Sequence, residues 1–333
     1  MGDDTGTGGD AAHRELVATT AGRVDAVLAA AWPDLSRARL QRLIAAGQAT
    51  VNSKPVRKSV QVDPGDRIAI DLPAYAHEAP AAVPELPILY EDAALVAVDK
   101  PAGLAVHGAP GDTGPTVAAW FLARYPAEAE AFDAEHPGIV HRLDKNTTGV
   151  LLLAKTPEAQ AAISRAFEAR TTRKTYVAIC DGIPAKPRAV IDAAIGRHTG
   201  DRTRMSIARQ GRDARTEYET LATGWGQSLL LVHPVTGRTH QIRVHLAAIG
   251  AAVAADKVYG KAGAGRQLLH AWQVTVPHPD GGTLTVTAPL PADMQDAVRA
   301  MGAEKIGLPY TIATPAVRQA AEEGETPSTE AGN

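Results

Sequence analysis

"HRLDKNTTGVLLLAKT", residues 141–156, places five charged or strongly polar side chains directly ahead of an apolar run. The run at 150–154 is short, and glycine before it and a Thr-Pro pair after it predict a buried strand rather than a helix. A rigid strand would hold the polar groups at its front edge in fixed positions, as catalytic groups require. The stretch alone still favours a simpler interpretation, a strand-entry turn in which Asp144 accepts backbone hydrogen bonds.

The length and composition of the chain limit the class of protein. A length of 333 residues suggests two domains, and the single cysteine, Cys180, excludes a disulfide framework and a cysteine-based zinc site. The first fifteen residues carry acids where a signal peptide needs bases, and no run is long enough to span a membrane. We therefore expect a soluble, cytoplasmic, monomeric protein with no membrane partner.

Basic residues cluster inside a chain whose formal net charge is −3, because acids collect near both ends. One acid-free run holds six basic residues, and a second cluster of arginines lies at 197–215. A charge run is usually a solvated face, but two basic clusters on an acidic chain argue for a polyanionic partner. The six candidate phosphate contacts of the first run are Arg37, Arg39, Arg42, Lys54, Arg57 and Lys58.

The first 73 residues have the pattern of a small α+β domain. A short helix should end before Pro33, and a second helix should follow Ser36 and stop at Gly47, ahead of short strands separated by turns. This arrangement, at residues 13–73, resembles the S-four RNA-binding domain. The resemblance implies RNA binding without specifying a reaction, because this domain accompanies several unrelated RNA enzymes. Residues 1–12 should be a disordered tail.

The rest of the chain predicts a second α+β domain over residues 88–303. Strand-like segments outnumber helices and follow one another directly, so the sheet should be mixed or antiparallel, with helices flanking it. The Pro- and Ala-rich stretch at 74–87 should be a semi-rigid linker. Residues 304–333, rich in Ala, Gly, Thr, Pro and Glu, should form a largely disordered extension.

Several familiar sites are missing from the sequence. It contains no G-x-G-x-x-G, no P-loop and no H-E-x-x-H pattern. His240 and His245 are five residues apart and do not match the spacing of a helical metal site. We therefore predict no metal and no organic cofactor.

The segment "TGRTHQIRVHLAAIG" at 236–250 predicts a helix that Thr239 caps and Gly250 ends. Arg243 would lie in its first turn on an otherwise apolar face, where a guanidinium needs an anion. Asp144 is the natural partner, since pairing relieves the cost of burying either charge. An ordinary buried salt bridge would leave the same pattern.

Three segments in order, "HRLDKNTTG", "RKTYVAI" and "TGRTHQIRVHLAAIG", resemble the signature segments of RluA-superfamily pseudouridine synthases, closest to the RluD type that modifies large-subunit ribosomal RNA. Matches such as "DKPAGLAVH" and "LLHAWQVTV" extend the resemblance over residues 90–294. The chain departs from the family at Asn146, at Thr148 and in "AADKVYG".

The resemblance implies a function and its residues. Asp144 would be the catalytic carboxylate of an isomerase that detaches uracil from its ribose and rejoins it through carbon 5. Tyr176 would stack on the extracted base, Arg142 would keep the nucleotide out of the helix stack, and Arg243 would support the site. Lys174 and Arg238 would contact RNA. Two alternatives stay open, namely attack by Asp144 on the sugar and a glycal-type elimination, and so does the choice between ribosomal and transfer RNA.

Two other kinds of protein compete with this interpretation. A non-catalytic ribosome-assembly factor could use the same basic surfaces, but it would have no need to keep Asp144, Tyr176 and Arg243 together. A glycoside hydrolase would use a second carboxylate beside Asp144, and no matched segment supplies one.

Overall fold

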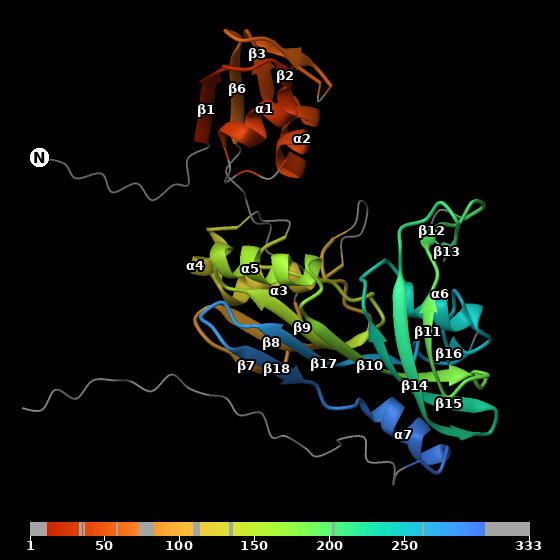
Figure 1. Cartoon of the computed structure of the whole chain (residues 1–333). Coiled ribbons are helices and arrows are strands. Elements are labelled where there is room, and N and C mark those ends of the chain that lie inside the picture. The colour runs from red at the N-terminus through yellow and green to blue at the C-terminus, as the bar shows by residue number, and fades with distance from the viewer. Residues whose placement is uncertain are drawn as a thin grey trace, which may run out of the picture. The chain divides into compact units, whose positions relative to one another are not determined.

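The computed structural model describes residues 12–32, 35, 37–57, 59–72, 83–108, 114–132, 136–201, 204–261 and 263–303, and the chain divides into two compact units (Figure 1). The first unit is residues 1–80 and the second is residues 81–333. The predicted tails at 1–12 and 304–333 lie almost wholly outside the described residues. Within the described residues, no helix is long and apolar enough to cross a membrane.

The first unit packs two short helices against a small antiparallel sheet of order β1-β6-β3-β4. Leu40 and Ile44 of the second helix are buried against Ile68 and Ile70 of β6, as the apolar spacing predicts. Gly47 ends that helix with φ +78°. The elements are β1 (Ala12–Val17), β2 (Gly22–Arg23), α1 (Val24–Ala31), α2 (Arg37–Ala45), β3 (Ala49–Val51), β4 (Lys54–Pro55), β5 (Gln61–Val62) and β6 (Arg67–Leu72).

The second unit is built on a ten-stranded sheet whose main path is β11-β14-β15-β10-β17-β9-β8-β7. All its strand pairs are antiparallel except β9 with β17, so the expectation of a mixed, mainly antiparallel α+β fold is confirmed. The elements that form and cover this sheet are β7 (Ile88–Glu91), β8 (Leu95–Lys100), α3 (Val117–Arg124), α4 (Pro126–Ala129), β9 (Thr148–Ala154), α5 (Pro157–Glu168), β10 (Arg173–Asp181), β11 (Arg188–Asp192), β14 (Arg215–Gly224), β15 (Gln227–Pro234), α6 (Gln241–Ala248), β16 (Ala252–Val253), β17 (Leu269–Pro277), β18 (Thr283–Thr287) and α7 (Ala292–Ala300), and β12 (Ile195–Arg197) pairs with β13 (Met205–Ile207) apart from it.

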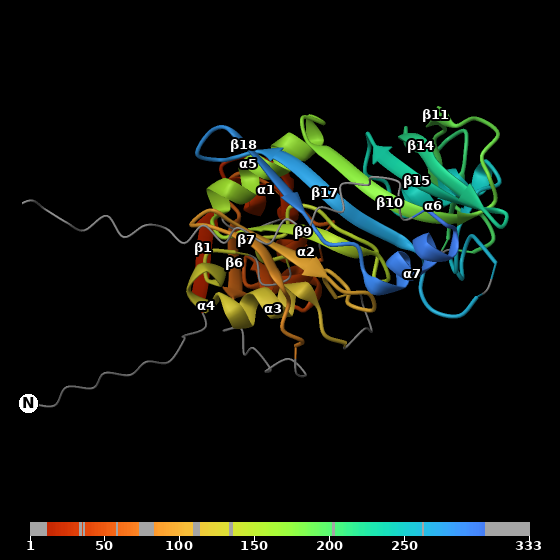
Figure 2. The ribbon, with the colours of Figure 1, turned by 90° about the horizontal axis from the view of Figure 1, so that it is seen from below.

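Alternating side chains of the buried strands pack against helices on both faces of the sheet. On β9, Leu151 and Leu153 join a core with Phe121 of α3, whereas Val150 and Leu152 join a core with Ile163 of α5. Figure 2 shows α3 and α5 on opposite sides of this half of the sheet. At the other end, α6 and α7 cover β10, β14 and β15 through two further cores. The predicted strand at 150–154 is therefore fully buried, and it begins two residues earlier, at Thr148.

A short parallel pairing of β9 with β17 joins the two halves of the sheet. The parallel pairing of β9 with β17 consists of Thr148 opposite His270 and Gly149 opposite Ala271. Gly149 has φ +110°, and a Cβ atom there would lie 2.2 Å from the carbonyl oxygen of Ala271. Glycine at 149 is thus part of the strand and lets the two backbones approach, rather than ending a turn before the strand as the sequence suggested.

The end of the predicted linker packs on the second unit. Residues 74–82 lie outside the described residues, but Leu86 is only 1% exposed and belongs to the core of Val96, Val98 and Phe121. The amide of Asp99 also donates to the carbonyl of Pro87. The apolar anchor at position 86 therefore attaches residues 83–87 to the second unit, which the composition of the stretch did not predict.

Candidate active site

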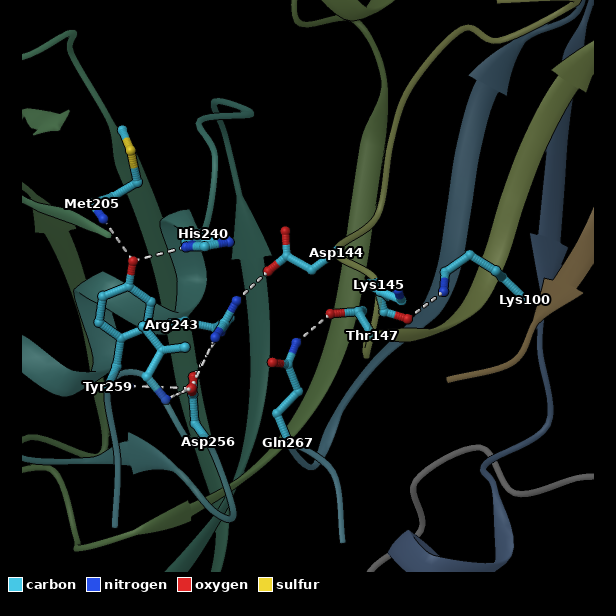
Figure 3. A network of polar contacts seen from close by, with 11 residues as sticks. Lys100, Asp144, Lys145, Thr147, Met205, His240, Arg243, Asp256, Tyr259 and Gln267 are labelled. Atoms are coloured by element: carbon cyan, nitrogen blue, oxygen red, sulfur yellow. Dashed lines mark hydrogen bonds and ion pairs between the residues drawn. The ribbon is translucent and has the colours of Figure 1, made fainter. Parts of the chain in front are cut away.

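The loop that carries Asp144 is held by a buried lysine. Lys100, at the end of β8, is 0% exposed and donates from Nζ to the carbonyls of Pro101, Leu104 and Lys145 at 2.8, 2.8 and 3.1 Å (Figure 3). Burial lowers the pKa of Lys100 to about 7. Its three acceptors match the three hydrogens of an ammonium group, so the lysine ties the loop after β8 to the loop before β9.

The start of the same loop is fixed by His141. Its Nε2 accepts the amide hydrogen of Leu152 over 2.9 Å, and its ring stacks on Phe167 of α5. Burial lowers the pKa of His141 to about 3, so the ring is neutral and its Nδ1 carries the hydrogen. His141 is a structural anchor between β9 and α5, and not one of the charged groups of the rim.

Asp144 is paired with Arg243, as the sequence predicts. The Nη1 atom of Arg243 lies 2.9 Å from Oδ2 of Asp144, and its Nε and Nη2 atoms contact Asp256 at 2.7 and 2.8 Å. The Arg243 side chain is 6% exposed, Asp256 is 0% exposed and Asp144 is 20% exposed. Burial opposes the charge on Arg243, but the hydrogen bonds and charges of the two carboxylates raise its pKa. Asp256 therefore neutralises the buried guanidinium, and Asp144 remains accessible.

Asp256 is held by the backbone that follows it. Its Oδ1 accepts hydrogen bonds from the amides of Val258 and Tyr259 at 2.9 and 3.2 Å. Burial alone would raise the pKa of Asp256, and the hydrogen bonds from Arg243 and these amides lower it. This carboxylate was missed in the sequence, although it lies in "AADKVYG" beside a segment that matches the family.

The helix that carries Arg243 starts later than predicted. α6 begins at Gln241, and its N-cap residue is His240 in the left-handed conformation, with φ 56°. Thr239 is exposed and does not cap the helix. The side chain of Gln241 instead accepts the amide hydrogen of Arg238 at 3.0 Å and the hydroxyl hydrogen of Thr236 at 2.7 Å. A buried glutamine replaces the expected threonine cap because the chain turns sharply at His240.

β10 contributes Tyr176 and Lys174 to the site. The pairing of β10 with β17 shifts register between Thr175 and Tyr176, and such irregularities change the direction of a side chain. Burial and then the charge of Asp144 raise the pKa of Tyr176. Burial lowers the pKa of Lys174 to about 8. Its Nζ lies 3.4 Å from the carbonyl of Thr236 and 5.9 Å from the centre of the Phe167 ring.

The site residues predicted in the second unit line one cavity of about 610 Å³. Asp144, Tyr176 and Arg243 lie there together with Arg142, Lys174 and Arg238, so the structure brings together all six residues predicted for the second unit. Arg170 and Arg212 add two further cations, against the single additional acid Glu168. A cavity in which cations outnumber carboxylates is suited to a polyanionic substrate.

The predicted contacts of the first unit are only partly described. Lys54 is exposed beside the turn at Asn52 and Ser53, and Arg57 is exposed in the segment that follows β4. Lys58 and the side chains of three arginines of α2, Arg37, Arg39 and Arg42, lie outside the described residues. Across the described part of the chain, no group of three or more His, Cys, Asp or Glu side chains is placed to hold a metal ion.

The sequence is similar to known RNA-modifying enzymes. Residues 94–248 match the family model for RNA pseudouridylate synthase, and residues 22–68 match the S4 domain. An uncharacterized RNA pseudouridine synthase of Chloroflexus aurantiacus is 43% identical over 84% of this chain and 90% of its own length. Ribosomal large subunit pseudouridine synthase D of Nitrosomonas europaea is 40% identical over 84% of each chain.

A solved structure has the same fold. Human RNA pseudouridylate synthase domain containing 1 superposes with a TM-score of 0.53 and 27% sequence identity, and the match covers 67% of this chain and 97% of the human chain. Together with the cavity, the accessible Asp144 carboxylate and the extent of the sequence matches, this structure identifies the family. The chain belongs to the RNA pseudouridine synthases of the RluA superfamily, and an S4 domain precedes its catalytic part.

Proposed function

We propose that this isomerase converts specific uridines of large-subunit ribosomal RNA to pseudouridine, with Asp144 as the catalytic carboxylate. One observation carries the assignment of the residue. Asp144 is the carboxylate of the Arg243 network that stays accessible, at 20% exposure, inside a cavity lined by cations. Asp256 is fully buried and committed to Arg243 and to backbone amides, so it cannot take that role.

The reaction is an intramolecular rearrangement that balances without a co-reactant. The bond between N1 of uracil and C1′ of the ribose breaks, and a bond between C5 and C1′ forms. N1 gains a proton and C5 loses one. A carboxylate beside the sugar can assist by adding to C1′ or by removing the C2′ proton, and the geometry is compatible with both.

The walls of the cavity fit a uridine turned out of an RNA helix. Tyr176 offers an aromatic face beside Asp144, and stacking of this kind offsets part of the cost of unstacking the base. Arg142 precedes Asp144 by two residues and is exposed at the rim, where it can keep the nucleotide extruded. Lys174 and Arg238 can contact the flanking phosphates.

The choice of substrate rests on relatives and on charge. Proteins named ribosomal large subunit pseudouridine synthase D are 40% and 35% identical to this chain in Nitrosomonas europaea and Xanthomonas campestris. The S4 domain adds a second RNA-binding unit, with Lys54 and Arg57 exposed on it. Action on ribosomal RNA would place the enzyme in the cytoplasm. Transfer RNA is the competing substrate.

Comparison of RNA from cells with and without the gene tests the activity and the substrate together. Pseudouridines in ribosomal and transfer RNA would be mapped, with the deletion strain complemented by wild type or by Asp144→Asn. We expect one or a few sites in large-subunit RNA to disappear and to return only with wild type. An unchanged map would contradict the proposed function, and losses confined to transfer RNA would contradict the substrate.

A further inference from the structure

His240 has an unusual backbone conformation at the wall of the cavity. It adopts φ 56° and ψ 18°, a left-handed conformation that is uncommon outside glycine, although histidine, asparagine and aspartate adopt it more often than other residues do. Its ring lies beside Asp144 in Figure 3, and the charge of Asp144 acts on it. An uncommon backbone conformation kept at the wall of the cavity points to a role for the side chain.

The hydrogen bonds of Tyr259 define the tautomer of this histidine. The hydroxyl oxygen of Tyr259 accepts the backbone N–H of Met205 at 2.8 Å, and it also lies 2.8 Å from Nδ1 of His240. Nδ1 is the acceptor available to the phenolic hydrogen among the described residues. When the phenol donates to Nδ1, its only hydrogen is satisfied, and the single hydrogen of the neutral imidazole is on Nε2.

His240 lines the cavity. Within the described ranges its Nε2 atom has no hydrogen-bond partner in the protein, and Figure 3 shows this atom on the side of the ring toward Asp144. Burial lowers the pKa of His240, which favours the neutral ring. The cavity thus contains a fixed, uncharged N–H donor next to the accessible carboxylate, in addition to its cations.

We propose that His240 is a positioning residue that donates its Nε2 hydrogen to the 2′-oxygen of the target ribose. This inference rests on the proposed function. Asp144 must reach C1′ or the hydrogen on C2′, and the 2′-oxygen is attached to C2′, so a donor beside the carboxylate faces that oxygen. A 2′-hydroxyl distinguishes RNA from DNA, so the same contact would select a ribonucleotide.

Two amide substitutions separate this role from a structural one. The amide oxygen of asparagine can take the position of Nδ1 and accept the Tyr259 hydrogen, and asparagine tolerates the left-handed conformation, so His240→Asn keeps the backbone and the Tyr259 contact but leaves nothing at Nε2. The amide nitrogen of glutamine reaches the position of Nε2, so His240→Gln restores the donor. Single-turnover release of the C5 hydrogen from RNA labelled with tritium at C5 of uridine measures the chemical step.

We expect His240→Asn to lose about tenfold in the single-turnover rate, the value of one hydrogen bond, and His240→Gln to stay within about threefold of wild type. A purely structural role predicts the reverse order, because asparagine suits the backbone better, and that order would overturn the proposal. Thermal unfolding of both variants would show whether either fails to fold. A target 2′-deoxyuridine should slow wild type by a larger factor than it slows His240→Asn. Additive losses would contradict the contact with the 2′-oxygen.

The tautomer can be tested without RNA or turnover. In protein labelled with nitrogen-15 at histidine, the signals of His240, identified by their loss in His240→Asn, should be those of an Nε2–H tautomer. Tyr259→Phe should mix the tautomers and lower the single-turnover rate several-fold. An Nδ1–H form in wild type would refute the inference. If wild type lacked turnover on every RNA tested, the proposed function would fail while the tautomer result still stood.

Discussion

Arg243 reaches Asp144 through Nη1 alone, at 2.9 Å, because its Nε and Nη2 atoms are already bound to Asp256. The same guanidinium thus has one fully buried partner and one partner that is open to the cavity. Asp256 neutralises Arg243 inside the protein, so Asp144 can interact with a substrate without leaving a buried cation unpaired.

Replacement by asparagine should lower mainly the stability at Asp256 and mainly the activity at Asp144. Asp256→Asn removes the buried partner of Arg243 and should lower the free energy of unfolding by about 3 kcal/mol or more. Asp144→Asn should cost about 1 kcal/mol, since its site is partly solvated, yet abolish pseudouridine formation with RNA binding intact. Urea denaturation, RNA binding and turnover would be measured on both variants. Turnover above a few per cent in Asp144→Asn would exclude Asp144 as the catalytic group.

The activity should depend on the aromatic ring of Tyr176 and not on its hydroxyl group. If the ring stacks on the extruded uracil, Tyr176→Phe should keep most of the activity, whereas Tyr176→Leu, which fills similar volume without an aromatic face, should lose about 1–3 kcal/mol of substrate stabilisation. Binding and single-turnover rates on the same RNA give the comparison. Equal loss in the two variants would indicate that the hydroxyl has a role that stacking does not explain.

RNA affinity should depend on pH through Lys174. Its pKa of about 8 means that the side chain is a cation below that pH and becomes neutral as the pH rises through it. A bound phosphate stabilises the cation and moves the transition upward, so affinity should decline from about pH 8 to pH 10. Lys174→Arg stays charged throughout and should remove this decline. Identical profiles for wild type and Lys174→Arg would show that Lys174 does not contact RNA.

Deletion of residues 1–80 should weaken binding without stopping the chemistry. The second unit contains Asp144, Tyr176 and Arg243 and has its own cores, and the deletion leaves Leu86 in place. Each lost phosphate contact should reduce the slope of log affinity against log salt by roughly one. Single-turnover rates at saturating enzyme should change little. Loss of turnover with an unchanged salt slope would mean that the first unit helps to build the active site.

Local patterns predicted much of the fold and the central ion pair. The apolar run of β9 and the helix stripe of α2 follow strong, short-range periodicity, and a lone arginine on an apolar helix face required an anion. These inferences depend on a few neighbouring residues, so the sequence contains all that they need. The resemblance to the family then assigned roles to Asp144, Tyr176 and Arg142.

Features created by long-range packing could not be predicted in the same way. Asp256 is thirteen residues from Arg243, on a loop beyond the helix, and nothing local marks it as the main partner of that arginine. The cap of α6 was wrong because Gln241 competes with Thr239, and the left-handed turn at His240 decides between them. Lys100 resembles an exposed loop lysine until the carbonyls of two other loop segments surround it.

The short parallel pairing of β9 with β17, which we call the seam, limits how the enzyme could be re-engineered. Asp144 precedes β9, whereas Tyr176 is on β10 and Arg243 is on α6, beyond β17, so the two residue pairs between β9 and β17 help to align the catalytic groups. The cores on either side can absorb conservative repacking, but a Cβ atom at position 149 would collide with the backbone of Ala271. In a library randomised at Gly149 and at Glu168, an exposed residue of the cavity with no assigned role, selection for pseudouridine formation should return only glycine at the first position and tolerate variety at the second. Target preference could then evolve at the rim while the seam stays invariant.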